Sequence, residues 1–336
     1  MNLVWNPAER RFRSGIRLAV QSMLFLLLAF GVVFVLGDII LPLIPESASV
    51  LQMEVRENFL LAEMVSPLIP LIAALLSVWL AGRYLDRREF RDFGFHWNKR
   101  WFKDFGFGLC LGALLMTFIF LTELALGWVK VTGFFQSQST GLPFLIGFIV
   151  DIIAYLSIGI YEELLFRGYY LRNLAEGLNM MWIGSKKALV IAFILTSILF
   201  GFLHGNNPGA TWISTVNIIL AGMFLAFGYI LTGELAIPIG LHISWNFVQG
   251  AIFGFPVSGL QSAASLVRIE QAGPVLFTGG FFGPEAGLLG ILSMLMGVML
   301  IYLYINRMNK SISLKTALAE YAIHAGSETV AERDIS

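Results

Sequence analysis

Ionisable side chains inside apolar segments are the most informative residues of this 336-residue chain. A charged group within a membrane span is expensive, and it is a candidate functional residue by default. Such side chains occur in or at the edges of apolar runs at Glu63, Glu123, Asp151, Glu162, Glu163, Arg167, His204 and His242. Some of these side chains, together with residues near them in the sequence, form three short groups. The spacing within each group could place its side chains for a chemical reaction.

The first group lies in the run from Tyr161 to Gly168. Glu163 and Arg167 are four residues apart, so on a helix they share a face and can form an ion pair. Glu162 is rotated by about 100° from Glu163 on the same helix, and it is therefore free to face a different environment. An internal ion pair would account for Glu163 and Arg167, but it leaves Glu162 without a partner.

The other two groups each contain a histidine. His204 follows Phe200 by one turn on the same face. A lone histidine at a helix end is more often a cap or an interfacial residue than a catalyst. His242 and Asn246 are also four residues apart and project from one helix face. Hydrogen bonding between membrane helices is the alternative role for this last pair.

Together, these side chains could hydrolyse a peptide bond. A carboxylate and a histidine can take a proton from water and return it to a leaving amine. A second histidine and an amide can donate hydrogen bonds to a developing oxyanion. The combination is more specific than any of its parts.

The order of the three groups resembles the CAAX prenyl protease 2 and bacteriocin-processing (CPBP) family. The resemblance covers about 145–250 and rests on Glu162-Glu163-x-x-x-Arg167, Phe200-x-x-x-His204 and His242-x-x-x-Asn246. It implies that Glu162 activates water together with His204. It also implies that His242 and Asn246 stabilise the oxyanion.

The same resemblance implies supporting roles for Glu163 and Arg167, which would orient the site, and for Phe200. The family is often described as metallopeptidases, and the alternative zinc ligands would be Glu162, His204 and His242. We nevertheless predict no cofactor, because the sequence lacks a His-Glu-x-x-His pair, which would place two histidines on one helix face. His242 is matched instead by Asn246, which is a poor zinc ligand.

Composition predicts an all-α, polytopic membrane helix bundle. The chain is 57% hydrophobic and 13% charged, whereas soluble domains are about a quarter charged. A spanning helix needs roughly 20 mostly apolar residues. Eight segments qualify, at 18–37, 60–82, 105–128, 143–166, 188–204, 212–232, 235–254 and 286–306. A catalytic core is expected in the fourth to seventh of them.

Basic residues predict the orientation, because Lys and Arg accumulate in cytoplasmic loops. Of the 22 Lys and Arg residues, only Arg56, Lys130 and Arg268 fall in predicted non-cytoplasmic loops. The other basic residues lie in the two terminal segments and in the loops on the same side, so both termini are expected in the cytoplasm. We expect a bacterial plasma membrane. The predicted division is 1–142 for the first three helices and 143–254 for the core. The remainder, 255–336, would form a long Gly-rich non-cytoplasmic loop, the eighth helix and a cytoplasmic tail.

This orientation places Glu162 and His242 near the cytoplasmic side, whereas His204 ends a helix that runs outward. For the three to converge, the fourth helix must continue beyond the lipid to about Glu176, and the fifth must begin outside it. Residues 167–176 keep helix-forming side chains, which permits this extension.

The expected partners are the lipid bilayer and a membrane-associated peptide or protein substrate. A prenylated CAAX protein, a bacteriocin leader and an unrelated membrane peptide are all compatible with the sequence. A net charge of zero gives no indication that the protein binds nucleic acid. The single Cys110 allows no internal disulfide, and no feature indicates an oligomeric state.

Two other classes of function stay open: a transporter with a buried proton or ion path, and a non-catalytic membrane scaffold. No paired halves of the kind common in transporters are recognisable.

Overall fold

The computed structural model describes residues 4–35, 66–137, 143–309 and 311–321. Glu63, Arg56 and the start of the second predicted span lie outside the described residues. The longer helices are α1 (Ser14–Phe34), α5 (Leu68–Ala81), α6 (Lys99–Ala125), α7 (Phe144–Glu163), α8 (Arg172–Leu178), α9 (Ser185–Leu203), α10 (Trp212–Thr232), α11 (Ala236–Phe247) and α13 (Leu288–Asn309). Short helical turns are η3 (Gly82–Asp86), η4 (Phe90–Phe93), η5 (Leu164–Leu171), η6 (His204–Asn206), η7 (Val248–Ile252), α12 (Val275–Thr278), η8 (Gly280–Phe282), η9 (Pro284–Ala286) and η10 (Thr316–Ala319).

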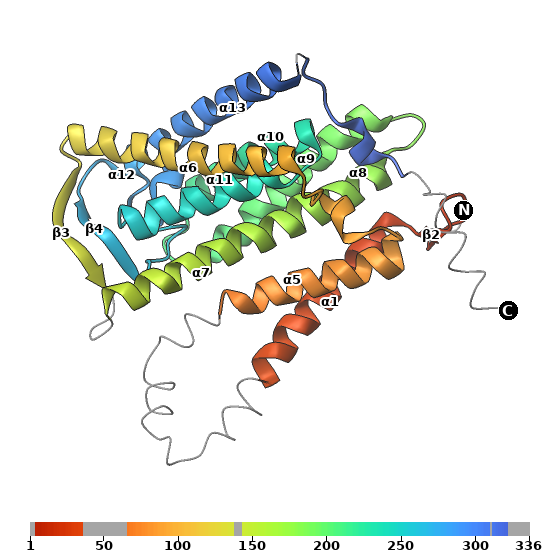
Figure 1. The fold of residues 1–336 in the computed structure, drawn as a ribbon, viewed down its shortest axis with the longest axis horizontal. Coiled ribbons are helices and arrows are strands. Elements are labelled where there is room, and N and C mark those ends of the chain that lie inside the picture. Colours follow the sequence, from red (N-terminus) through yellow and green to blue (C-terminus); the bar gives the residue numbers. More distant parts are fainter. Residues whose placement is uncertain (1–3, 36–65, 138–142, 310, 322–336) are drawn as a thin grey trace, which may run out of the picture.

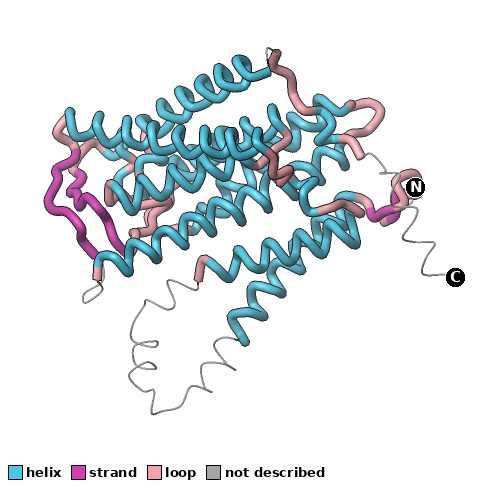
Figure 2. The backbone as a smooth tube through the Cα atoms, in the orientation of Figure 1, coloured by secondary structure: helices cyan, strands magenta, loops and turns pink. Residues whose placement is uncertain are grey.

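Within the described chain, seven helical segments are long and apolar enough to cross a membrane. They lie side by side in a mostly helical bundle, as Figures 1 and 2 show. The prediction of a polytopic helical membrane protein is therefore confirmed. Helices α1 and α5 pack on each other and reach the rest of the bundle through α7, η5 and α8.

The span predicted at 235–254 differs from expectation. It forms the 12-residue helix α11 and the π-helical turn η7, which together are shorter than the other seven segments. Every residue from Ala236 to Asn246 is buried, because α6, α7 and α10 pack around this helix. A Cβ atom at Gly240 would collide with the backbone of α6 at Phe105, so glycine permits the close helix contact. The apolar run of α11 thus reflects packing inside protein rather than contact with lipid.

The predicted extension of the fourth helix is confirmed. Helix α7 continues through the π-helical η5 into α8, so that one helical segment runs from Phe144 to Leu178. Its far end is held by the buried carboxylate of Glu176, which accepts hydrogen bonds from Arg11 at 2.8 Å and Arg17 at 3.2 Å. Arg88 contacts the same carboxylate. The ion pairs explain why the helix persists beyond its most apolar part.

A two-stranded ribbon closes one end of the bundle and was not predicted. Strand β3 (Val129–Ser137) pairs antiparallel with β4 (Ala264–Gln271), so part of the predicted Gly-rich loop is a strand. The carboxylate of Asp151 in α7 accepts hydrogen bonds from the backbone of Ala263 and Ala264 at 2.9 Å each, which anchors the ribbon to the bundle. A smaller pair, β1 (Trp5–Asn6) and β2 (Arg11–Phe12), lies at the opposite end (Figure 1).

Candidate active site

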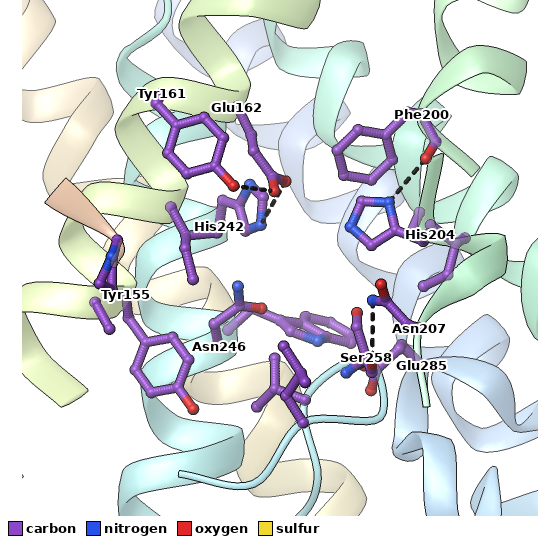
Figure 3. A pocket seen from close by; sticks show the side chains of 18 of the residues that line it. Tyr155, Tyr161, Glu162, Phe200, His204, Asn207, His242, Asn246, Ser258 and Glu285 are labelled. Carbon is purple, nitrogen blue, oxygen red and sulfur yellow. Dashed lines mark hydrogen bonds and ion pairs between the residues drawn. The ribbon is translucent and has the colours of Figure 1, made fainter. Parts of the chain in front are cut away.

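A cavity of about 990 Å³ lies between α5, α7, α9, α10 and α11. Five of the seven predicted site residues line it, namely Glu162, Phe200, His204, His242 and Asn246. They point toward one another across the cavity in Figure 3. The other two predicted residues, Glu163 and Arg167, are buried and do not line the cavity. The structure therefore brings together three motifs that are far apart in the sequence.

Glu163 is held by two partners within the protein. Its Oε1 atom accepts a hydrogen bond from Arg167 Nη1 at 2.9 Å and lies 2.8 Å from His242 Nδ1. An ionised carboxylate only accepts hydrogen bonds, so Nδ1 of His242 is assigned the proton. Arg167 also donates to the carbonyl oxygen of Gly222 at 2.8 Å, and its guanidinium lies 4.6 Å from the ring centre of Phe200. These contacts join α7 to α9, α10 and α11.

Glu162 faces the cavity and has a different environment from Glu163. Its Oε1 atom accepts a hydrogen bond from the Tyr161 hydroxyl at 3.1 Å. Its Oε2 atom is buried and 3.8 Å from His242 Nε2, and it accepts no hydrogen bond from the described residues. A carboxylate oxygen with free lone pairs beside a cavity is suited to bind water or a substrate N–H group. The arrangement has the form expected of a general base.

His204 lies across the cavity from Glu162, at the end of α9 (Figure 3). Its Nδ1 atom is 2.8 Å from the carbonyl oxygen of Phe200, which accepts only, so Nδ1 carries the proton and Nε2 is left for the cavity. The Phe200 ring lies 4.6 Å from His204 and 6.3 Å from His242, centre to centre. Within the described chain His204 forms no ion pair with Glu162. The two could therefore act together only through a molecule bound between them.

The alternative zinc ligands do not form a compact group. Glu162 and His242 are neighbours, but His204 is on the opposite wall. Across the described ranges, no group of three His, Cys, Asp or Glu side chains is arranged to hold a metal ion.

Several polar side chains of the cavity were not predicted. Glu285 in η9 accepts hydrogen bonds from the Ser258 backbone N–H and from Gln249 Nε2. Asn207 donates to the carbonyl oxygen of Ser258 at 2.9 Å. Glu285 follows a Gly-Pro pair, outside any helix motif, and an acidic residue in such a loop gives no signal of burial. The fold buries this side chain to 4% exposure at the edge of the cavity.

The pH dependence of stability is expected to report on Glu285. Burial raises the pKa of its carboxyl from 4.5 to about 7, against the opposing effect of the hydrogen bonds it accepts. The folded protein therefore binds this proton more tightly than the unfolded chain does. The corresponding stabilisation, about 3 kcal/mol at most, is fully present below pH 4.5 and is lost as the pH rises through about 7.

We expect the unfolding midpoint of the wild type in detergent to fall more steeply between about pH 5 and about pH 8 than that of Glu285→Gln. The variant has no titrating carboxyl at this position, so the difference between the two proteins isolates one group. Parallel pH profiles would show that Glu285 titrates alike in the folded and unfolded states.

The motif residues at the cavity lie within a part of the chain that matches a known family. Residues 143–248 match the Rce1-like family model, described as type II CAAX prenyl endopeptidase Rce1-like. The matched range contains all seven motif residues and confirms the resemblance to the CAAX prenyl protease and bacteriocin-processing family over this part of the chain. No curated protein and no solved structure matches the chain. Together with the apolar helices, the match supports a multi-pass membrane protein and, in general terms, an intramembrane protease of the CAAX type.

Proposed function

We propose that the protein is an intramembrane endopeptidase that hydrolyses a peptide bond of a membrane-associated protein or peptide. The observation that carries the proposal is the unequal environment of two adjacent carboxylates. Glu163 is bound by Arg167 and His242 and does not line the cavity, whereas Glu162 lines the cavity and forms no ion pair with an arginine in the described chain. Each carboxylate has one oxygen that accepts no hydrogen bond from the described residues, but only that of Glu162 belongs to a side chain lining the cavity. Pairs of carboxylates with different environments take different roles in hydrolysis.

In the proposed reaction, Glu162 takes a proton from a water molecule while the water oxygen attacks the carbonyl carbon of the substrate. The carbonyl oxygen becomes negatively charged and accepts hydrogen bonds from His242 and Asn246. To donate there, His242 must carry a proton on Nε2 before the water attacks, in addition to the Nδ1–H that donates to Glu163, and it keeps both protons during the reaction. When the carbon–nitrogen bond breaks, the proton on Glu162 passes to the leaving amine. His204 takes part in this proton transfer from the opposite wall.

The walls of the cavity support a substrate that is associated with the membrane. They are mainly apolar, and residues of α1 and α5 such as Phe25 and Pro70 contribute to them. A lipidated or hydrophobic segment could therefore reach Glu162 without leaving an apolar environment. We further propose that both termini are cytoplasmic, as the distribution of Lys and Arg indicates.

A comparison of membrane peptides tests this function. Cells that express the wild type should accumulate shortened peptides or proteins that are missing from cells expressing Glu162→Gln at the same level. Identical peptide profiles would favour the non-catalytic scaffold instead. Ion or proton flux through proteoliposomes, lost in the same variant, would favour the transporter.

We expect the purified enzyme to retain its activity after treatment with a membrane-permeant chelator. Catalytic zinc typically takes three protein ligands, whereas here Asn246 occupies the position four residues after His242. Activity and bound metal are measured in parallel before and after chelation. Loss of activity that is restored by about one zinc per chain would instead assign the reaction to metal-activated water.

A further inference from the structure

Glu285 is a buried carboxylate at the edge of the cavity, outside the three motifs and outside the matched range 143–248. Its Oε1 atom accepts hydrogen bonds from the backbone N–H of Ser258 and from the Ser258 hydroxyl, the latter at 3.3 Å. Its Oε2 atom accepts from Gln249 Nε2. Gln249 Nε2 also donates directly to the carbonyl oxygen of Pro256 at 2.5 Å. The segment of Ser258 is therefore joined to η7 both directly and through Glu285.

The contacts with Gln249 and with Ser258 connect Glu285 to different walls of the site. Gln249 lies in η7, three residues after Asn246, and is fully buried. Ser258 leads to the opposite wall, because its carbonyl oxygen accepts the hydrogen bond from Asn207, three residues after His204. A continuous chain of polar contacts therefore runs from the Asn246 wall through Glu285 to the His204 wall. Figure 3 shows Asn207, Ser258 and Glu285 grouped at the end of the cavity away from Glu162.

Ser258 is held in a conformation that needs support. Its φ angle is 48°, in the left-handed region, which is uncommon for residues other than glycine. Backbone conformations of this kind persist where the surroundings determine them. Ser258 and Gly259 form the two-residue turn between Val257 and Leu260, in which positive φ angles are usual. The hydrogen bonds from Ser258 to Glu285 and from Asn207 to Ser258 add further support to this conformation.

We propose that Glu285 is a positioning residue that fixes the separation of His204 and Asn246. The proposal rests on the proposed function, in which these two side chains act on the same peptide bond from opposite walls. A small displacement of one wall lowers the stabilisation of the transition state more than it weakens substrate binding. Glu285 itself touches no reacting atom in this scheme.

The informative variant is Glu285→Gln. Its amide oxygen can still accept from Ser258, but its NH2 group meets the NH2 group of Gln249, so the hydrogen bond between residue 285 and Gln249 is lost. Glu123→Gln is the matched control, because Glu123 is fully buried in α6 and accepts from Gln271 Nε2 at 2.7 Å, away from the cavity. Both variants replace the carboxylate of a buried Glu–Gln pair.

We expect kcat of Glu285→Gln to fall by about 10- to 100-fold with KM nearly unchanged, whereas Glu123→Gln keeps the wild-type kcat. Only protein that elutes as a single folded species is assayed, so that loss of yield does not enter the rate. Wild-type kcat in Glu285→Gln overturns the positioning role, and so does an equal fall of kcat in Glu123→Gln.

Amide hydrogen exchange gives a readout that does not depend on cleavage. The proposal predicts faster exchange over residues 248–260 in Glu285→Gln and unchanged exchange there in Glu123→Gln. Equal exchange in wild type and Glu285→Gln overturns the link itself. If Glu162→Gln cleaves as fast as the wild type, the proposed hydrolysis fails, and the exchange measurement still decides whether Glu285 holds the two walls together.

Discussion

Glu162→Gln is expected to lower the rate of peptide hydrolysis by about 10²- to 10⁴-fold, the range typical of a lost general acid–base group. Glutamine keeps the shape and can still accept the hydrogen bond from Tyr161, but it cannot take a proton from water. Because Glu162 forms no ion pair with Lys or Arg in the described chain, the folded yield should be close to that of the wild type. The measurement is the cleavage rate of the purified variant on the substrate found by peptide profiling.

Glu234→Gln is the control for this experiment. Glu234 also pairs with a histidine, since its Oε1 atom lies 2.9 Å from His96 Nδ1, but it does not line the cavity. We expect it to hydrolyse the substrate at the wild-type rate. His204→Ala and His242→Ala should share the defect of Glu162→Gln, and full activity of Glu162→Gln would exclude it as the base.

Arg167→Ala is expected to destabilise the protein by about 3–5 kcal/mol, because it removes the arginine from a buried ion pair with Glu163. The side chains of both residues are at most 2% exposed. Loss of the hydrogen bond from Arg167 to Gly222 adds to the effect by releasing α7 from α10. The change is measured as the unfolding midpoint and the folded yield in detergent, and activity per folded molecule should fall as well.

Arg91→Ala tests whether burial explains the loss of stability. Arg91 and Glu89 form another ion pair, 2.7 Å apart, but their side chains are 62% and 64% exposed. Pairs that reach solvent contribute about 0–1 kcal/mol, so this variant should unfold close to the wild type. Equal losses in the two arginine variants would contradict a special role for the buried pair.

Features that lie within one helix could be predicted from the sequence. A spacing of four residues fixes a shared face, and the Glu163–Arg167 pair and the common side of His242 and Asn246 follow from it. The extension of α7 toward Glu176 could be inferred because the candidate site residues had to meet, although its cause, a carboxylate surrounded by arginines, was not visible.

Contacts between distant segments could not be predicted. His242 meets Glu163 across 79 positions, and no local pattern encodes that contact. Strand β4 was read as a loop because its only strand partner, β3, lies far away in the sequence. The sequence did not reveal that protein surrounds α11 on all sides, since an apolar run looks the same whether lipid or protein surrounds it.

The enclosure of α11 also determines when the site can exist during biosynthesis. Polar side chains such as those of His242 and Asn246 are costly in lipid, so α11 is stabilised by the helices that surround it. Its neighbours α6, α7 and α10 all precede it in the chain, so they are made before α11 emerges. Under the proposed function, the nascent chain carries the proposed base before it carries the groups that stabilise the oxyanion, and the site is complete only after α11 has joined the bundle.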